Sequence, residues 1–263
     1  MRPIDRGNAP VHITSRGIQP ALSETYSLFK GELIQRLGEY CSYCEVPLGA
    51  NLAIEHVLPK TRNLNEENAW SNFLLSCINC NSSKGSKEIL RADYYWPDDT
   101  AINLATSGFN TFSMLEYYFD QPTQKVLLKA NPGSGANVAK VDATIKLTGL
   151  NKYDDTNLKV SDRRVTNRTN TWNAARRMAT TLSNYYTSYS RMSDQNQAAI
   201  AAAQDPAIII LKRQITIAAL AAGFWSVWMT IFKDRTFTFI NDTVRDTLLT
   251  ELFVRPFPGT RYP

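Results

Sequence analysis

Four cysteines form two pairs of identical spacing, and the 263-residue chain has no others. The pairs are Cys41-Ser-Tyr-Cys44 and Cys77-Ile-Asn-Cys80, with 32 residues between them. Zn²⁺ is held well by four thiolates in a tetrahedral arrangement, and each pair can occupy one tight turn. Because four protein ligands leave no open coordination position, we predict a structural zinc. On the cysteines alone, a plain zinc ribbon without catalysis explains the pattern equally well.

Residues among and after the pairs are of the types that phosphodiester hydrolysis needs. That reaction requires a base for water, a divalent cation at the phosphate and a group that orients the base. His56 is one of only two histidines, and a neutral imidazole can take a proton near neutral pH. Glu55 and Asn81 offer oxygen ligands suited to Mg²⁺ or Mn²⁺. Asn72 could orient the imidazole through a hydrogen bond, although a lone His–Asn pair would as readily serve capping or packing.

The order and spacing of these residues resemble the cysteine-knuckle type of the HNH endonuclease family. The resemblance rests on residues 41–45, 54–60 and 70–85. It implies a ββα-metal fold in which His56 is the general base, Glu55 binds the divalent cation and Asn72 is the central asparagine. The family's last histidine is replaced here by Asn81. The implied site is therefore a His-Asn-Asn variant, with catalytic His56 and Asn72 and with oxygen ligands that favour Mg²⁺ or Mn²⁺.

A looser resemblance concerns the layout of the whole chain. A Met-Arg-Pro-Ile start, an early motif and a long helical tail are similar to the HNH nucleases of bacterial antiphage defence, including those of Septu and retron-associated systems. That resemblance implies a role in defence and a partner ATPase. We expect a nucleic-acid substrate, with DNA favoured over RNA. The competing interpretation is a non-enzymatic zinc-bearing module that binds nucleic acid or protein.

Charge is distributed unevenly along a chain whose formal net charge is +5. Residues 1–100 hold 10 Lys/Arg against 12 Asp/Glu, and the remainder holds 19 against 12. A basic second part is typical of a protein whose later segment holds a polyanion. A solvated helix face or an acidic partner protein would explain the same charge. The residues predicted to contact nucleic acid are Lys60 and Lys84 beside the motif, and Arg163, Arg164, Arg168, Arg176 and Arg177 in the basic run 159–191.

Hydrophobic periodicity and turn residues, together with the ββα-metal fold that the resemblance implies, lead us to expect an α+β protein. It would consist of a small ββα-metal zinc-knuckle module followed by a mainly α-helical region. We divide it into an arm and helix (1–38), the nuclease module (39–100), a hairpin-containing connector (101–131) and a basic helical domain (132–263), with the boundary at the linker 131–136. The expected elements are helices in 23–37, 136–147, 157–192 and 241–253, a strand at 52–54, and a hairpin of 114–119 with 125–129.

One uncharged run, residues 215–232, barely reaches the length that spans a bilayer. Its Thr216, Gly223, Ser226 and Thr230 weaken that reading, so we predict a buried helix and no membrane contact. The start of the chain lacks the apolar core of a signal peptide. We therefore expect a reducing compartment, the cytoplasm, in which paired cysteines favour metal over disulfides.

Overall fold

The computed structural model describes residues 1–14, 17–20, 26–49, 52–103, 108–153 and 162–262. It divides into two compact units. The first comprises Met1–Tyr118, Leu127–Arg164 and Pro258–Pro263, and the second comprises Phe119–Val126 and Val165–Phe257. Small two-stranded sheets and many helices confirm the α+β class. Residues 127–164, which include the predicted linker 131–136, belong to the first unit.

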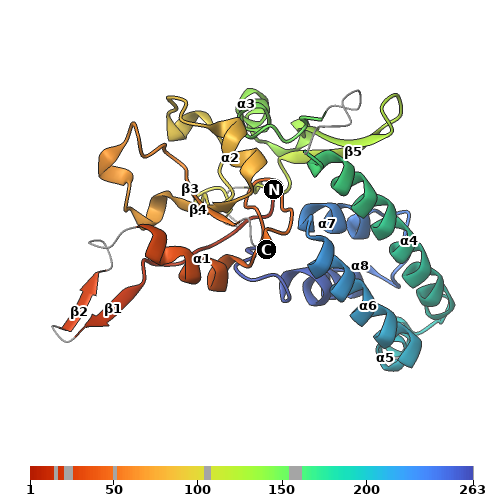
Figure 1. Cartoon of the computed structure of the whole chain (residues 1–263). Coiled ribbons are helices and arrows are strands. Elements are labelled where there is room, and N and C mark those ends of the chain that lie inside the picture. Colours follow the sequence, from red (N-terminus) through yellow and green to blue (C-terminus); the bar gives the residue numbers. More distant parts are fainter. Residues whose placement is uncertain (15–16, 21–25, 50–51, 104–107, 154–161, 263) are drawn as a thin grey trace. The chain divides into compact units, whose positions relative to one another are not determined.

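The first unit contains a strand–strand–helix motif around the cysteine pairs (Figure 1). Strand β3 (Ala53–His56) pairs antiparallel with β4 (Phe73–Ser76), and helix α2 (Ile78–Lys84) follows directly. In this register His56 lies opposite Phe73. Strand β4 is buried along its whole length, which explains its apolar Phe-Leu-Leu sequence. The expected ββα arrangement is confirmed.

Further elements of the first unit surround this motif. Helix α1 (Lys30–Leu37) follows a 3-10 helix at Tyr26–Phe29, and residues 21–25 of the predicted helix lie outside the described residues. Helix α3 (Val138–Thr148) confirms the helix expected at 136–147. Strands β1 (Val11–Thr14) and β2 (Gly17–Pro20) form a hairpin where we expected an extended arm. Strands β5 (Leu115–Asp120) and β6 (Lys125–Ala130), whose residues 119–126 belong to the second unit, confirm the second hairpin.

Aromatic side chains form the core beneath the ββα motif. Phe29 packs against Trp70 and Phe73, with ring centroids 5.7 Å and 5.5 Å apart. All three side chains are buried. Phe73 also faces His56 across the strand pair, so the packing of this core helps to fix the position of the imidazole ring.

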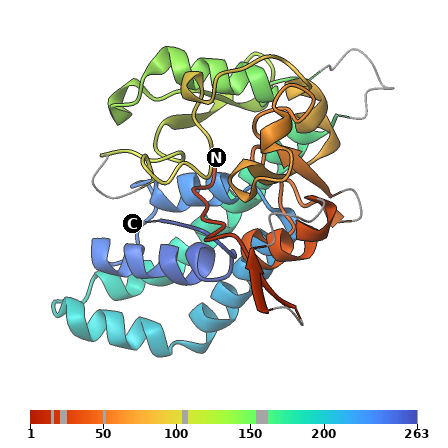
Figure 2. The same cartoon turned by 90° about the vertical axis from the view of Figure 1, so that its left-hand side faces the viewer.

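The second unit is helical and contains α4 (Arg164–Ser190, from Val165), α5 (Gln195–Gln204), α6 (Pro206–Ala222), α7 (Trp225–Lys233) and α8 (Asp242–Leu249). These helices, coloured from green to blue, pack into one group (Figure 2). Trp228, Phe232 and Phe253 lie in the core, with the rings of Phe232 and Phe253 5.0 Å apart. The indole N–H of Trp225 donates to the Phe253 carbonyl at 2.7 Å, so its polar atom is satisfied inside the core.

The uncharged run 215–232 is two helices rather than the single helix that we predicted. The chain turns at Gly223 and Phe224, whose φ angles are 68° and 52°. Both values lie in the left-handed region, which ends α6 and starts α7 in a new direction. Among the described residues, we find no helix with the length and apolarity needed to cross a membrane.

Candidate active site and metal centre

Two short turns carry the four cysteines. The first is closed by a hydrogen bond from the Glu45 N–H to the Cys41 carbonyl at 2.8 Å, and Glu45 adopts a left-handed φ of 67°. In the second, Cys77 precedes α2 in an extended conformation, and its sulfur accepts from the Cys80 N–H at 3.4 Å. All four sulfur atoms lie within 4.8 Å of one another. The sequence-predicted cysteine cluster is therefore confirmed as a structural feature.

The cluster fits a tetrahedral zinc ion. The four cysteines form no disulfide, and Cys44 Sγ lies 3.7 Å from Cys77 Sγ. Two thiolates at about 2.3 Å from a tetrahedral zinc are about 3.8 Å apart. Burial raises the pKa of the Cys44 and Cys80 thiols, because a charged sulfur loses its water there. A divalent cation at the centre would hold them as thiolates.

A pocket of about 540 Å³ brings together five of the predicted site residues, Glu55, His56, Lys60, Asn81 and Lys84. They come from β3, from the loop after it and from α2. Asn72 is outside this lining. The pocket is thus built by the ββα motif itself, with basic, acidic and amide groups around one imidazole.

His56 is held in a defined chemical state. Its Nε2 lies 2.9 Å from the Glu67 carbonyl oxygen. Because a carbonyl only accepts, Nε2 carries the proton and Nδ1 keeps its lone pair. The rings of Tyr26 and Phe73 meet the imidazole edge-on, with centroids at 4.9 Å and 5.3 Å. Burial lowers the pKa of His56, with the Lys60 charge acting in the same direction, so the ring is neutral at neutral pH.

Asn72 acts differently from the hydrogen bond to the imidazole that the sequence suggested. Its Oδ1 accepts from the Leu58 N–H at 2.7 Å, and its Nδ2 donates to the carbonyls of Leu58 and Glu66 at 2.9 Å and 3.0 Å. These contacts correct the expectation. Asn72 holds the loop between β3 and β4, and Glu67 in that loop supplies the carbonyl that orients His56. Glu67 was missed because a backbone carbonyl leaves no signal in the sequence.

Glu55 and Lys84 form a buried ion pair in the pocket wall. Lys84 Nζ lies 3.0 Å from Glu55 Oε1 and donates to the His56 carbonyl at 2.7 Å. The Tyr43 hydroxyl, which sequence reasoning also missed, donates to the same carboxylate oxygen at 3.3 Å. Burial raises the pKa of Glu55, and the Lys84 charge opposes that rise. Lys84 was predicted to contact nucleic acid, and this is corrected, because its ammonium group points inward to Glu55 and the His56 carbonyl.

Oxygen donors suited to a hard divalent cation are present in this pocket. Glu55 and Asn81 both line it, and carboxylate and amide oxygens are the ligands that Mg²⁺ and Mn²⁺ prefer. The donor set therefore fits the catalytic cation that the sequence predicted. Lys84 already balances part of the Glu55 charge, so a bound cation would share this carboxylate with the ammonium group.

Lys60 lies near the imidazole on the loop that follows β3. Its Nζ donates to the Tyr26 hydroxyl at 3.0 Å and lies 3.5 Å from Glu67 Oε1. About two fifths of its side chain remains exposed. A contact of Lys60 with phosphate stays a prediction.

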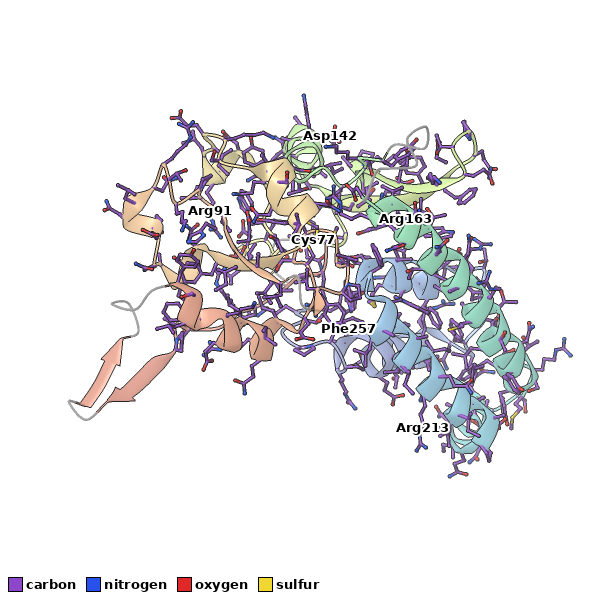
Figure 3. All side chains as sticks on the ribbon, viewed as in Figure 1. Cys77, Arg91, Asp142, Arg163, Arg213 and Phe257 are labelled. Carbon is purple, nitrogen blue, oxygen red and sulfur yellow. The ribbon has the colours of Figure 1, made fainter. Side chains whose placement is uncertain are left out.

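The basic arginines at helix α4 divide into exposed and buried groups. Arg163, Arg176 and Arg177 are exposed, and Figure 3 labels Arg163 at the start of the helix. Arg164 and Arg168 are buried at 3% and 2% exposure. Arg164 pairs with Asp162 at 2.7 Å, and Arg168 donates to the Val126 carbonyl at 2.8 Å. The two buried arginines are corrected from nucleic-acid contacts to internal partners. Lys159, also part of the predicted basic run, lies outside the described residues.

Residues 41–87 match the family model of the HNH endonucleases. The matched segment contains both cysteine pairs, β3, β4, α2 and the whole lining of the pocket apart from Tyr26. Neither a curated protein nor a solved structure matches the chain. The chain therefore contains an HNH endonuclease domain with a four-cysteine cluster, followed by a helical region that no comparison covers.

Proposed function

We propose that the protein is a metal-dependent endonuclease that hydrolyses phosphodiester bonds in nucleic acid, with DNA preferred over RNA. The observation that carries this proposal is the state of His56, whose Nε2–H is donated to Glu67 while Nδ1 keeps its lone pair. The same pocket offers oxygen donors from Glu55 and Asn81. The HNH family match supports the reaction class, and the preference for DNA follows from the family resemblance.

In this mechanism His56 Nδ1 accepts a proton from water while the water oxygen forms its bond to phosphorus. The bond from phosphorus to the 3′ oxygen breaks, and the departing oxygen takes a proton from solvent. The Glu67 carbonyl keeps the ring oriented and stabilises the imidazolium that forms. Glu55 and Asn81 would hold Mg²⁺ or Mn²⁺, which supplies charge stabilisation at the phosphate. Asn72 positions the loop that carries Glu67.

The four cysteines have a separate part in the proposal. They would hold a zinc ion that fixes both turns and so places β3 and α2 relative to each other. Four thiolates fill the coordination sphere, so the residues of the pocket carry the chemistry. Loss of a cysteine should then disturb folding, whereas loss of the imidazole should remove cleavage alone.

The test compares wild type with His56→Ala on plasmid DNA and on RNA, each with Mg²⁺, Mn²⁺ or EDTA. We expect the variant to cleave at least ~100-fold more slowly, the usual contribution of a general base, with unchanged zinc content. Asn63→Ala is the matched control, since Asn63 lies in the loop that follows β3 but does not line the pocket. Wild type and variant that both bind but never cleave would instead identify a non-enzymatic zinc-bearing module. Faster cleavage of RNA would reverse the substrate preference.

The proposal extends to a biological role because of the looser whole-chain resemblance described above. We propose that the nuclease acts in the cytoplasm as an antiphage-defence effector beside a partner ATPase. Phage plating on cells that express wild type or His56→Ala tests the role, and co-purification from the native cell tests the partner. Equal plating with both forms, or no ATPase in the purified complex, would contradict this extension.

A further inference from the structure

Arg164 places a guanidinium group on the cysteine cluster from outside the segment that the family model matches. Its Nη1 lies 3.0 Å from Cys80 Sγ and 3.1 Å from the Thr148 carbonyl. On its other side, Nε and Nη2 lie 2.9 Å and 2.7 Å from the carboxylate oxygens of Asp162. The guanidinium is buried. These contacts on both sides of the guanidinium therefore fix the directions in which its N–H groups point.

The local backbone is built to bring this group to the sulfur. Gly149 ends α3 with a φ of 63°, and a Cβ at that position would lie 2.7 Å from Ser83 Oγ and 3.5 Å from Arg164 Nη2. A larger residue would push the end of α3 away from α2. The close approach keeps the Thr148 carbonyl and Cys80 within reach of one guanidinium.

Charge explains why a donor is needed there. Four thiolates around one Zn²⁺ carry a net charge of −2, and Cys80 is 0% exposed, so water does not solvate this sulfur. Buried charge is costly unless it is hydrogen-bonded. The Arg164–Asp162 pair is neutral as a whole, so Arg164 acts chiefly as a charge-assisted hydrogen-bond donor to the sulfur. Groups that donate to a metal ligand in this way orient it and adjust its affinity.

We propose that Arg164 is a positioning residue of the zinc centre, which holds Cys80 as a ligand and ties zinc retention to the segment that begins helix α4. This inference rests on the zinc centre of the proposed function but not on its catalytic part. The chain passes from the first unit to the second directly after Arg164. Zinc in the nuclease domain would therefore order the point at which the helical region starts.

Zinc transfer from the full chain to the chelator 4-(2-pyridylazo)resorcinol tests the inference. We expect Arg164→Met to release zinc about 10- to 100-fold faster than wild type, the usual effect of losing such a partner. Arg164→Lys keeps the charge but loses the planar guanidinium. Its rate of zinc release should lie between those of wild type and Arg164→Met. Arg163→Met is the matched control, because this neighbouring arginine is exposed, and it should behave as wild type.

Cobalt substitution gives a second measurement that does not depend on cleavage. The thiolate-to-Co²⁺ charge-transfer band should shift in the Arg164 variants, because Cys80 loses a donor. If Arg164→Met fails to fold, the double variant Asp162→Asn/Arg164→Gln removes both charges of the ion pair together. Wild-type release rates and spectra in these variants would overturn the inference while leaving the zinc centre in place. A purified wild type without zinc would overturn both, and neither result depends on the His56 test of catalysis.

Discussion

The chemical state of His56 comes from the backbone and from packing rather than from another polar side chain. The Glu67 carbonyl sets the tautomer, and the edges of Tyr26 and Phe73 set the plane of the ring. A fixed tautomer matters because only the unprotonated nitrogen can act as a base. The arrangement therefore leaves Nδ1 as the ring nitrogen that could accept a proton in the proposed reaction.

The pH dependence of the cleavage rate should reflect the pKa of His56. We call the low-pH side of this profile, where the rate rises with pH, its acid limb. Burial and the nearby Lys60 and Lys84 charges lower the pKa of His56 below its ordinary value of 6.5. The neutral base therefore persists to lower pH than for a free histidine, and the rate should rise to its plateau with an apparent pKa under 6.5. Single-turnover cleavage between pH 4.5 and pH 8 (~half-unit steps) measures that pKa.

Lys60→Gln offers an internal check on the cause. Its charge lowers the pKa of His56, so its removal should move the acid limb to higher pH. Arg62→Gln is the matched control, since this exposed cation is two residues away and pairs with Glu88. An acid limb at or above 6.5 in wild type, or one that Lys60→Gln leaves in place, would contradict the assignment of this limb to a His56 whose pKa is lowered by burial and by Lys60.

Residue types at the site were readable from the sequence, whereas their partners were not. The motif identified His56, Glu55 and Asn81, and the structure brings them into one pocket. The contacts of Asn72 go to main-chain groups, and the position of those groups depends on a loop conformation that periodicity does not encode. The inward position of Lys84 also escaped prediction, because its two partners, the Glu55 carboxylate and the His56 carbonyl, come near it only in the folded chain.

At the scale of elements, the ββα motif was expected because of the family resemblance, whereas periodicity alone predicted its first strand, at 52–54. The break at Gly223 was not predicted, since hydropathy registers an uncharged run and not its backbone angles. Helix α4 shows a further limit of prediction from the sequence. Arg168 is buried although its sequence neighbours are Thr and Asn, and Arg176 is exposed although two Ala residues precede it. The burial of Arg168 follows from its contact with the Val126 carbonyl.

Helix α4 should bind nucleic acid through its exposed arginines. The helix has no Asp or Glu in its 27 residues, and Arg176, Arg177, Asn170 and Asn173 are exposed on it. We expect Arg176→Glu/Arg177→Glu to weaken binding by about 10-fold or more, because two phosphate contacts become repulsive. The slope of log K against log salt should fall by about 2. Fluorescence anisotropy with the His56→Ala background measures binding without cleavage.

The control for this prediction reverses the same number of charges elsewhere. Arg213→Glu/Arg255→Glu changes two exposed arginines outside α4, and Figure 3 labels Arg213 on α6. Binding should be close to wild type in that variant. If both double variants lose affinity equally, net charge rather than helix α4 is responsible, and the assignment of this surface is wrong.

At the scale of the whole molecule, the two units depend on different sources of stability. In the first, the cysteine cluster joins the turn at Cys41, the end of β4 and the start of α2. In the second, the packed helices bury an aromatic core of Trp225, Trp228, Phe232 and Phe253. The four cysteines all belong to the first unit, so zinc should stabilise one unit and leave the other largely unaffected.

Chelation should therefore unfold the molecule in part. With zinc removed at neutral pH, burial favours protonation of Cys44 and Cys80, and the free energy of metal binding no longer contributes to folding. Amide hydrogen exchange should become at least ~100-fold faster in residues 53–56 and 73–84, while residues 225–233 keep their protection. Cys41→Ser/Cys44→Ser should show the same pattern without a chelator. Faster exchange throughout both units would mean that zinc holds one cooperative structure, and unchanged exchange in β4 and α2 would mean that the cluster contributes little to folding.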